Sequence, residues 1–166
     1  MEEAMLEHRI LNYVRGIGKA LEDEWQCKAK ELGLTFAEQH VMWIIYSKHK
    51  ISISEIATLG LWNRSTVMQM MTRLAKKELI VMSKDTKDLR VTYVELTEKG
   101  DRKREESQLK EFKVLNFIKE KWDNDPVMME YVAEFSREFN LHFHGKEFVD
   151  WVGSATKSNS TNLKDK

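Results

Sequence analysis

Residues 52–80, SISEIATLGLWNRSTVMQMMTRLAKKELI, decide the fold of this chain. Ser52 and Glu55 form a capping box, which predicts that a short helix begins directly after Ser52. Residues 59–61, Leu-Gly-Leu, predict a turn, and Asn63 offers an N-cap for a second helix. Two short helices joined by a tight turn predict a helix-turn-helix, which is a common way to place one helix in a DNA groove.

The second of these helices has two chemically different faces. Val67, Met71 and Leu74, with Met70 at the margin, follow helical spacing and predict a face packed in the core. The opposite face carries polar side chains that can hydrogen-bond to base edges and phosphates. We predict that Asn63, Arg64, Ser65, Thr66, Gln69 and Arg73 form a DNA-binding recognition helix. An ordinary solvated helix face is the alternative.

After this helix the apolar pattern changes to a period of two. Residues 80–84 and 91–96 therefore predict two strands, joined by a polar hairpin. The tip of the hairpin is basic and poorly suited to packing on a core. We predict that Lys84, Lys87, Asp88 and Arg90 form a DNA-binding wing, in which Asp88 orients Arg90 by a charge-assisted hydrogen bond. A solubilised β-turn is the alternative.

Long helices with apolar stripes flank this central unit. Residues 4–31 predict one helix, and Thr35 with Glu38 forms a second capping box before another. Thr97 caps a further helix, whose apolar stripe continues through Leu109, Phe112, Leu115, Ile118 and Trp122. Pro126 predicts a last helix, which Gly145 is expected to interrupt.

The expected fold is mainly α, a winged helix-turn-helix with a two-stranded β wing and long terminal dimerisation helices. We assign residues 1–34 to an N-terminal dimerisation helix and 35–100 to the DNA-binding domain. Residues 101–153 are assigned to C-terminal dimerisation helices and 154–166 to a disordered tail, because the tail has almost no apolar residues. Exposed apolar stripes are costly in water, so we expect a homodimer.

Charge is local in this chain. Lysine plus arginine and aspartate plus glutamate balance at 27 each over 166 residues, which excludes a globally basic protein. Between Arg64 and Arg90, however, seven basic and three acidic residues leave a net charge of +4. This excess on one compact unit is enough for several phosphate contacts in each subunit.

The wing region carries a family signature. The pattern D-x-x-D-x-R-x-x-x-x-x-L-T-x-x-G occupies residues 85–100, with ISEIA at 53–57 and STV at 65–67 at matching spacings. The chain resembles the MarR family of winged-helix regulators over roughly residues 5–145. The stretches LGLTFAEQHVMWIIY (32–46) and TYVELTEKG (92–100) make it similar to the Hpr (ScoC) type found in bacilli.

The resemblance implies a homodimer whose first and last helices interleave. It also implies a pseudo-palindromic double-stranded DNA site that two recognition helices and two wings read. Regulators of the Hpr type repress genes for extracellular proteases and sporulation, so the resemblance implies such a repressor here. We expect a cytoplasmic, nucleoid-associated protein, because the N-terminus lacks signal-peptide features.

Two kinds of signal-responsive MarR-type regulator remain as alternatives. A small-molecule effector would need a cleft, which Trp25, His40, Trp43 and Tyr46 could line, although core packing is the simpler interpretation. Redox sensing would use Cys27, the one cysteine of the chain, whose thiolate form nearby carboxylates would oppose and Lys28 and Lys30 would favour.

No metal, cofactor or catalytic residue is expected. His142 and His144 supply too few ligands for a closed zinc site unless Glu147 or a second subunit adds to them. The sequence contains no phosphate-binding glycine loop and no G-x-S-x-G or H-E-x-x-H motif, so we do not expect an enzyme. A winged helix that binds protein instead of DNA is the remaining alternative.

Overall fold

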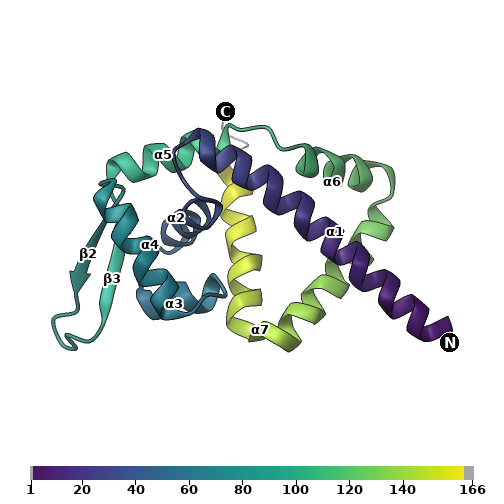
Figure 1. The fold of residues 1–166 in the computed structure, drawn as a ribbon, viewed down its shortest axis with the longest axis horizontal. Helices are drawn as coiled ribbons and strands as arrows, with labels where there is room; N and C mark the ends of the chain where they lie inside the picture. Colours follow the sequence, from purple (N-terminus) through teal and green to yellow (C-terminus); the bar gives the residue numbers. More distant parts are fainter. Residues whose placement is uncertain (1, 163–166) are drawn as a thin grey trace.

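The computed structural model of the chain describes the backbone of residues 2–162 and the side chains of residues 5–154. Within this part the order is α1 (Glu2–Glu31), α2 (Phe36–Lys48), β1 (Lys50–Ser52), α3 (Ile53–Leu59), α4 (Arg64–Lys76), β2 (Ile80–Lys84), β3 (Thr92–Leu96), α5 (Glu98–Gln108), α6 (Lys113–Asn124) and α7 (Pro126–Asn162). The chain is mainly helical with one small sheet. The predicted winged helix-turn-helix is confirmed, and Figure 1 shows it as the compact body opposite the N-terminus.

The local signals that begin the helices of this body are present. Thr35 and Ser52 each accept a hydrogen bond from the backbone of the glutamate three residues later, which completes both predicted capping boxes. Asn63 caps α4 by accepting from the Thr66 amide. In the turn between α3 and α4, Leu61 has the positive φ of 57°. Gly60 is needed for space, because a Cβ there would lie 2.1 Å from the Trp62 ring.

The sheet has one more strand than predicted. Its order is β1-β3-β2 and both pairs are antiparallel, with Ile51 and Met82 each paired with Val94. The predicted two-stranded wing is present as β2 and β3, and the sequence did not predict the third strand. The third strand, β1, is only three residues long and follows α2 after His49 alone, which is too short for a period-two pattern.

The core lies inside the winged helix-turn-helix. Helix α2 is buried on most sides, as predicted, and four of its apolar residues are almost wholly inaccessible. Helix α4 contributes Val67, Met70, Met71 and Leu74, so Met70 lies fully in the core and not at its margin. Helices α3 and α4 contact each other, so α4 packs against α3 as the helix-turn-helix prediction requires.

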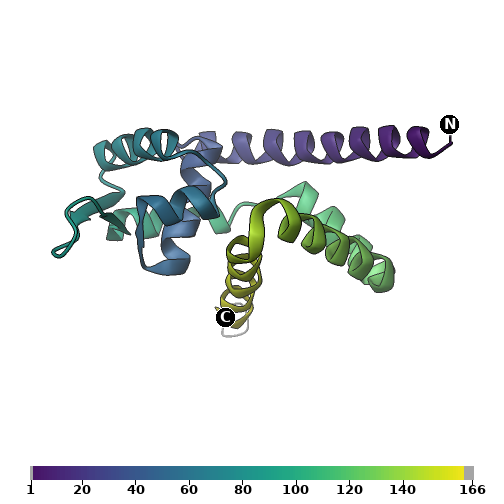
Figure 2. The same ribbon diagram turned by 90° about the horizontal axis from the view of Figure 1, so that it is seen from below.

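Three helices extend beyond this core. Figure 2 shows α1 as a straight rod whose N-terminal half projects away from the body. Helix α6 contacts α1, and α7 contacts both α6 and α3. The predicted continuous helix after Thr97 is wrong, because α5 ends at Gln108 and α6 begins at Lys113. The Glu24 carboxylate of α1 accepts from the Lys113 and Val114 amides at 2.7 and 2.9 Å and so caps the new helix.

Helix α7 has two limbs. Gly145 adopts a non-helical conformation with φ 80° and ψ 176°, which confirms the predicted interruption. The second limb continues to Asn162, so a disordered tail beginning at residue 154 was wrong for this part, and residues 163–166 lie outside the described residues. Within the described residues, none of the helices combines the length and apolarity that a membrane span requires.

Candidate nucleic-acid interface

The N-terminal end of α4 is organised by Asn63. Its side-chain oxygen accepts from the Thr66 amide at 2.8 Å, the Thr66 hydroxyl at 2.9 Å and the Ser65 hydroxyl at 2.6 Å. The hydroxyl oxygens of Ser65 and Thr66 keep their acceptor capacity, while Asn63 is occupied with capping. The structure therefore places Asn63 as a residue that orients the first turn of α4.

The exposed face of α4 carries most of the predicted recognition residues. Arg64, Ser65 and Gln69 are exposed and Thr66 is half-buried. Met68 and Thr72 are exposed as well, and the Thr72 hydroxyl donates to the Met68 carbonyl at 2.9 Å. The sequence pattern did not single out these two, because Met68 counts as apolar and threonine is common on solvated helix faces.

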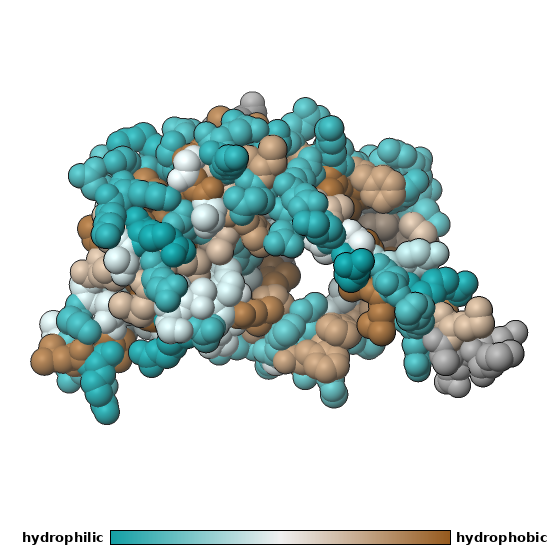
Figure 3. All heavy atoms as spheres, viewed as in Figure 1, coloured by the Kyte–Doolittle hydropathy of each residue, from teal (hydrophilic) through white to brown (hydrophobic). Residues whose placement is uncertain are grey.

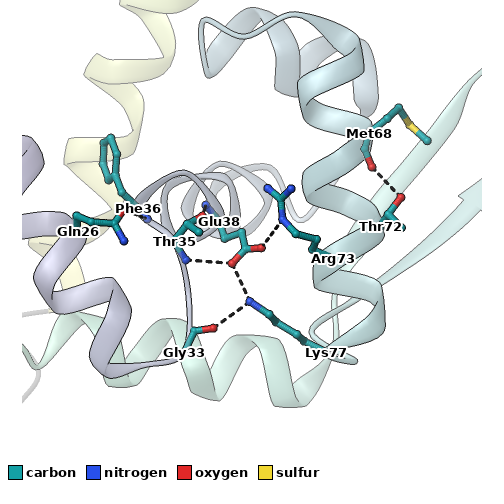
Figure 4. Close-up of polar contacts among 9 residues, drawn as sticks. All are labelled: Gln26, Gly33, Thr35, Phe36, Glu38, Met68, Thr72, Arg73 and Lys77. Carbon is teal, nitrogen blue, oxygen red and sulfur yellow. Dashed lines mark hydrogen bonds and ion pairs between the residues drawn. The ribbon is translucent and has the colours of Figure 1, made fainter.

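Arg73 does not join this group. Its Nε donates to Glu38 Oε1 at 2.9 Å, and Lys77 Nζ, one turn further along the chain, donates to Glu38 Oε2 at 2.8 Å (Figure 4). Glu38 lies on α2, so Arg73 is turned toward the body of the domain. The Arg73 Nε is thereby engaged by Glu38, although the side chain is 49% exposed, and a DNA contact of Arg73 stays a prediction. The pattern of one helix face could not show this pairing, because the partner lies 35 residues away.

The wing is held by hydrogen bonds that its own aspartates accept. Asp85 accepts from the Lys87 and Asp88 amides at 2.7 and 2.8 Å, which shapes the tip. Asp88 accepts from Arg90 Nε and from its NH2 group, both at 3.0 Å, so the predicted pair is present and is bidentate. The hydrogen bonds from Arg90 lower the pKa of Asp88. Lys84 donates to the Thr92 hydroxyl at 2.9 Å.

The start of α4 and the C-terminal side of the wing loop line one groove. The groove has a volume of about 310 Å³ and brings Arg64 of α4 next to Asp88 and Arg90 of the wing. Its remaining lining residues are Ser52, Ile53, Ser54, Val91 and Thr92. The sequence had placed Arg64 and Arg90 on separate elements, and the fold makes them neighbours on one surface. Two guanidinium groups and several hydroxyl groups suit a phosphodiester backbone.

The aromatic residues considered for an effector cleft do not form one site. Trp25 and His40 belong to a cluster of rings around His40. Trp43 and Tyr46 contact each other edge to face, and the guanidinium of buried Arg104 lies over both rings, 3.7 Å from the Tyr46 ring centroid. A larger cavity of about 750 Å³ lies between the two limbs of α7, and none of these four residues lines it.

The residues considered for redox and metal chemistry lie on the terminal helices α1 and α7. Cys27 is exposed on α1. His142 and His144 each contact a phenylalanine ring of α7 edge to face. Among the side chains that the structure describes, no group of three or more histidine, cysteine, aspartate or glutamate residues could hold a metal ion.

A known family matches the part of the chain that contains these features. The family model described as "Transcriptional regulator SarA/Rot" matches residues 25–107, from the end of α1 to α5. The chain belongs to the SarA/Rot family of transcriptional regulators. Membership agrees with the MarR-like signature in the wing.

Curated relatives of this SarA/Rot-family chain are regulators of the Hpr type. It is 40% identical over 102 residues to "HTH-type transcriptional regulator Hpr" of Geobacillus thermodenitrificans, across 61% of this chain and 51% of the relative. It is 38% identical over 100 residues to the Hpr regulator of Lysinibacillus sphaericus, across 60% of this chain and 54% of the relative. The chain spans about half the length of the curated relatives that it matches. The predicted resemblance to the Hpr type is confirmed.

Solved structures confirm the MarR-type winged-helix fold. AbsC, a MarR family transcriptional regulator from Streptomyces coelicolor, superposes with a TM-score of 0.72 at 15% identity, covering 85% of this chain and 96% of AbsC. A mutant MarR from E. coli, complexed with operator DNA, superposes with a TM-score of 0.68 at 18% identity, covering 77% and 93%. At these identities the likeness concerns the fold alone.

Proposed function

We propose that this SarA/Rot-family chain is a sequence-specific regulator of transcription that binds double-stranded DNA as a homodimer. One observation carries the proposal: Arg64, at the start of the exposed polar face of α4, and Arg90 of the wing line one groove. A solvated helix face and a solubilised turn have no reason to align their guanidinium groups. A duplex that lies across both elements accounts for the arrangement.

The two elements would have different tasks. Arg64, Ser65, Thr66 and Gln69 would enter the major groove, where such side chains distinguish base edges. The wing would follow the backbone through Lys84 and Lys87, and Arg90 would reach the adjacent minor groove. Asp88 would hold the Arg90 guanidinium in the extended orientation that this contact needs.

The homodimer is supported by apolar surface that the small core leaves uncovered. On α1, residues 5–17 expose Met5, Leu6, Ile10, Leu11, Tyr13, Val14 and Ile17. On α6 and α7 the exposed apolar residues include Phe117, Trp122, Tyr131, Val132, Phe135, Phe139 and Phe143. A second copy that covers these helices would remove this surface from water, at about 25 cal/mol per Å² of apolar area.

Symmetry would then define the DNA site. Two-fold related recognition helices contact half-sites about 34 Å, or one helical turn, apart. The operator would be a short inverted repeat. Residues 1–34 and 101–153 would supply the dimer contacts, and residues 35–100 would bind DNA.

The biological role is inferred from similarity to the Hpr type. We extend the proposal to repression of genes for extracellular proteases and sporulation, in the cytoplasm and at the nucleoid. Messenger RNA levels in cells with and without the gene test this extension. Protease transcripts should rise when the gene is deleted, and unchanged transcripts would limit the proposal to DNA binding.

Replacing Arg90 tests the wing. In Arg90→Ala, affinity for every duplex should fall by a similar factor, because the arginine no longer reaches the minor groove and its phosphates. The slope of log affinity against log salt should become shallower by about one for each phosphate that Arg90 neutralises. Fluorescence anisotropy with labelled duplexes between low and moderate salt measures both quantities. Unchanged affinity at moderate salt would show that the wing does not touch DNA.

Replacing Gln69 tests the recognition helix. In Gln69→Ala, the preferred duplex should lose about 1–3 kcal/mol of binding energy if Gln69 contacts a base, while binding to non-specific duplex changes little. Competition between the preferred duplex and a scrambled duplex gives the ratio of the two affinities directly. Equal losses on both duplexes would mean that Gln69 does not read sequence. Salt-insensitive retention by the wild type would instead favour a winged helix that binds protein.

A further inference from the structure

Glu38 is a buried carboxylate that joins α2 to the recognition helix. Only 1% of its side chain is exposed. Oε2 accepts from the Thr35 amide at 3.0 Å and from Lys77 Nζ at 2.8 Å, and Oε1 accepts from Arg73 Nε at 2.9 Å. Figure 4 shows both basic side chains reaching from α4 and its C-cap to this one group. Lys77 also donates to the Gly33 carbonyl at 2.9 Å, so it bridges the end of α4 to the end of α1 as well.

Helix capping alone does not explain this arrangement. Glu55 occupies the same capping-box position at α3, where it accepts from the Ser52 amide at 2.9 Å. Yet Glu55 is exposed, and its hydrogen bonds among the described residues are to Ser52 and not to a basic side chain. The chain thus contains two chemically equivalent capping boxes, and only Glu38 is buried and paired with cations.

Glu38 is charged at neutral pH. Burial raises the pKa of a carboxyl group, but here the hydrogen bonds from Lys77, Thr35 and Arg73 outweigh burial and lower the pKa of Glu38. A buried charge is tolerated only when it is well paired, so the pairing with α4 is strongly held.

The pairing constrains α4 in two ways. Arg73 and Lys77 lie one helical turn apart, and each contacts a different carboxylate oxygen, so α4 cannot rotate about its axis without breaking one of these bonds. Their positive charges are also neutralised in part, and the Arg73 Nε and the Lys77 ammonium are directed toward the body of the domain. The two side chains are still 49% and 37% exposed, so they would be available to phosphates if released.

We propose that Glu38 is a positioning residue that sets the sequence selectivity of the recognition helix. It fixes the rotation of α4, and it withholds Arg73 and Lys77 from non-specific phosphate contacts. This inference rests on the proposed function, because it concerns how the same helix meets DNA.

Glu38→Gln is the decisive variant, because glutamine keeps the capping acceptor and the volume but removes the charge. Non-specific affinity should rise by about threefold or more, and the salt slope should steepen by about one to two per subunit. The ratio of the affinities for the preferred and the scrambled duplex should fall about tenfold below the wild-type ratio. A change of this size is typical of one mismatched base pair. Glu55→Gln is the matched control and should change neither slope nor selectivity.

Arg73→Ala tests the same inference in a protein that keeps Glu38 and its Lys77 partner. If Glu38 holds Arg73, this variant should lose selectivity while its salt slope stays at the wild-type value. In the Glu38→Gln background the same change should make the slope shallower, because the released Arg73 is removed. A shallower slope for Arg73→Ala alone would show that Arg73 already contacts phosphate, and the inference would fall.

The outcomes separate the two proposals. If the wild type binds no duplex at all, the proposed function fails before any variant is compared. If the wild type binds selectively and Glu38→Gln behaves like Glu55→Gln, only the role of Glu38 is overturned. If circular dichroism shows that Glu38→Gln does not fold, the salt slopes of Arg73→Ala and the wild type test the role of Glu38. Equal slopes would support it, and a shallower slope for Arg73→Ala would contradict it.

Discussion

His40 is a half-buried ionisable ring that lies among aromatic side chains. Its centroid lies 5.6 Å from that of Trp62, 6.2 Å from that of Trp151 and 6.3 Å from that of Trp25. These rings come from the turn before α4, the second limb of α7 and α1. A single histidine therefore joins the recognition unit to both terminal helices. Burial lowers the pKa of His40 below its ordinary value of 6.5.

This lowered pKa predicts a stability that depends on pH. The unfolded chain takes up the proton first as pH falls, so folding stability should decrease from about pH 6.5 downward, until the folded pKa is passed. One such group contributes at most about 1.4 kcal/mol per pH unit. Urea unfolding between pH 7 and 5 measures it. In His40→Phe the free energy of unfolding should depend less on pH. In His8→Gln, at an exposed position of α1, its pH dependence should equal that of the wild type. The same pH dependence in all three proteins would contradict this explanation.

At the level of elements, Gly100 sets how closely α5 approaches the start of β2. A Cβ at this position would lie 2.0 Å from the Leu79 carbonyl oxygen, which also accepts from the Thr97 amide at 3.1 Å. Thr97 caps α5 by accepting from the Gly100 amide at 3.0 Å. The L-T-x-x-G end of the wing motif therefore has a physical basis in one close contact between backbones.

Gly100→Ala should destabilise the fold by about 1–3 kcal/mol, because the backbone must move to admit the methyl group. Gly18→Ala is the control. Nothing lies within 4 Å of that added Cβ in the interior of α1, and the change should stabilise by about 0.5–1 kcal/mol. Urea unfolding at one fixed protein concentration compares them. A Gly100→Ala protein as stable as the wild type would show that the contact relaxes without cost.

Some elements could be predicted from the sequence and others could not, for a physical reason. The starts of α2, α3 and α4 were predictable because their N-caps use residues three positions apart, whereas α3 ends at Leu59 and not at Ala57 as expected. Strand β1 and the start of α6 were not predictable, since β1 depends on pairing with β3 and α6 is capped by Glu24 from α1. The candidate site follows the same rule. Asp88 and Arg90 are two residues apart and were recognised as a pair, whereas Arg73 and Glu38 are not local.

At the level of the whole molecule, apolar surface is concentrated away from the core. Figure 3 shows an opening within the arm formed by α1, α6 and α7, between the two limbs of α7, with apolar side chains on its rim. Several large residues of this arm are more than half exposed, among them Ile17 at 60% and Phe135 at 59%. Contiguous surface of this kind marks an interface, and a second copy is the occupant that we propose.

Substitutions that introduce charge into this surface should separate the subunits. Ile17→Glu with Phe135→Glu should convert a dimer into a monomer, because burying unpaired carboxylates costs more than the contacts return. Sedimentation equilibrium gives the mass. Leu89→Glu, at the wing tip and 72% exposed, should keep the dimer mass. A wild type that sediments as a monomer at micromolar concentration would contradict the proposed assembly.

Selection of binding sites from a pool of random DNA duplexes by the purified full chain tests the central claim most directly. We expect enrichment of a short inverted repeat whose half-sites lie about 10 base pairs apart, centre to centre. The affinity of the protein for that repeat should fall steeply as salt rises. Recovery of no common sequence, or of a sequence that is retained equally at all salt concentrations, would contradict a dimeric, sequence-specific DNA-binding regulator.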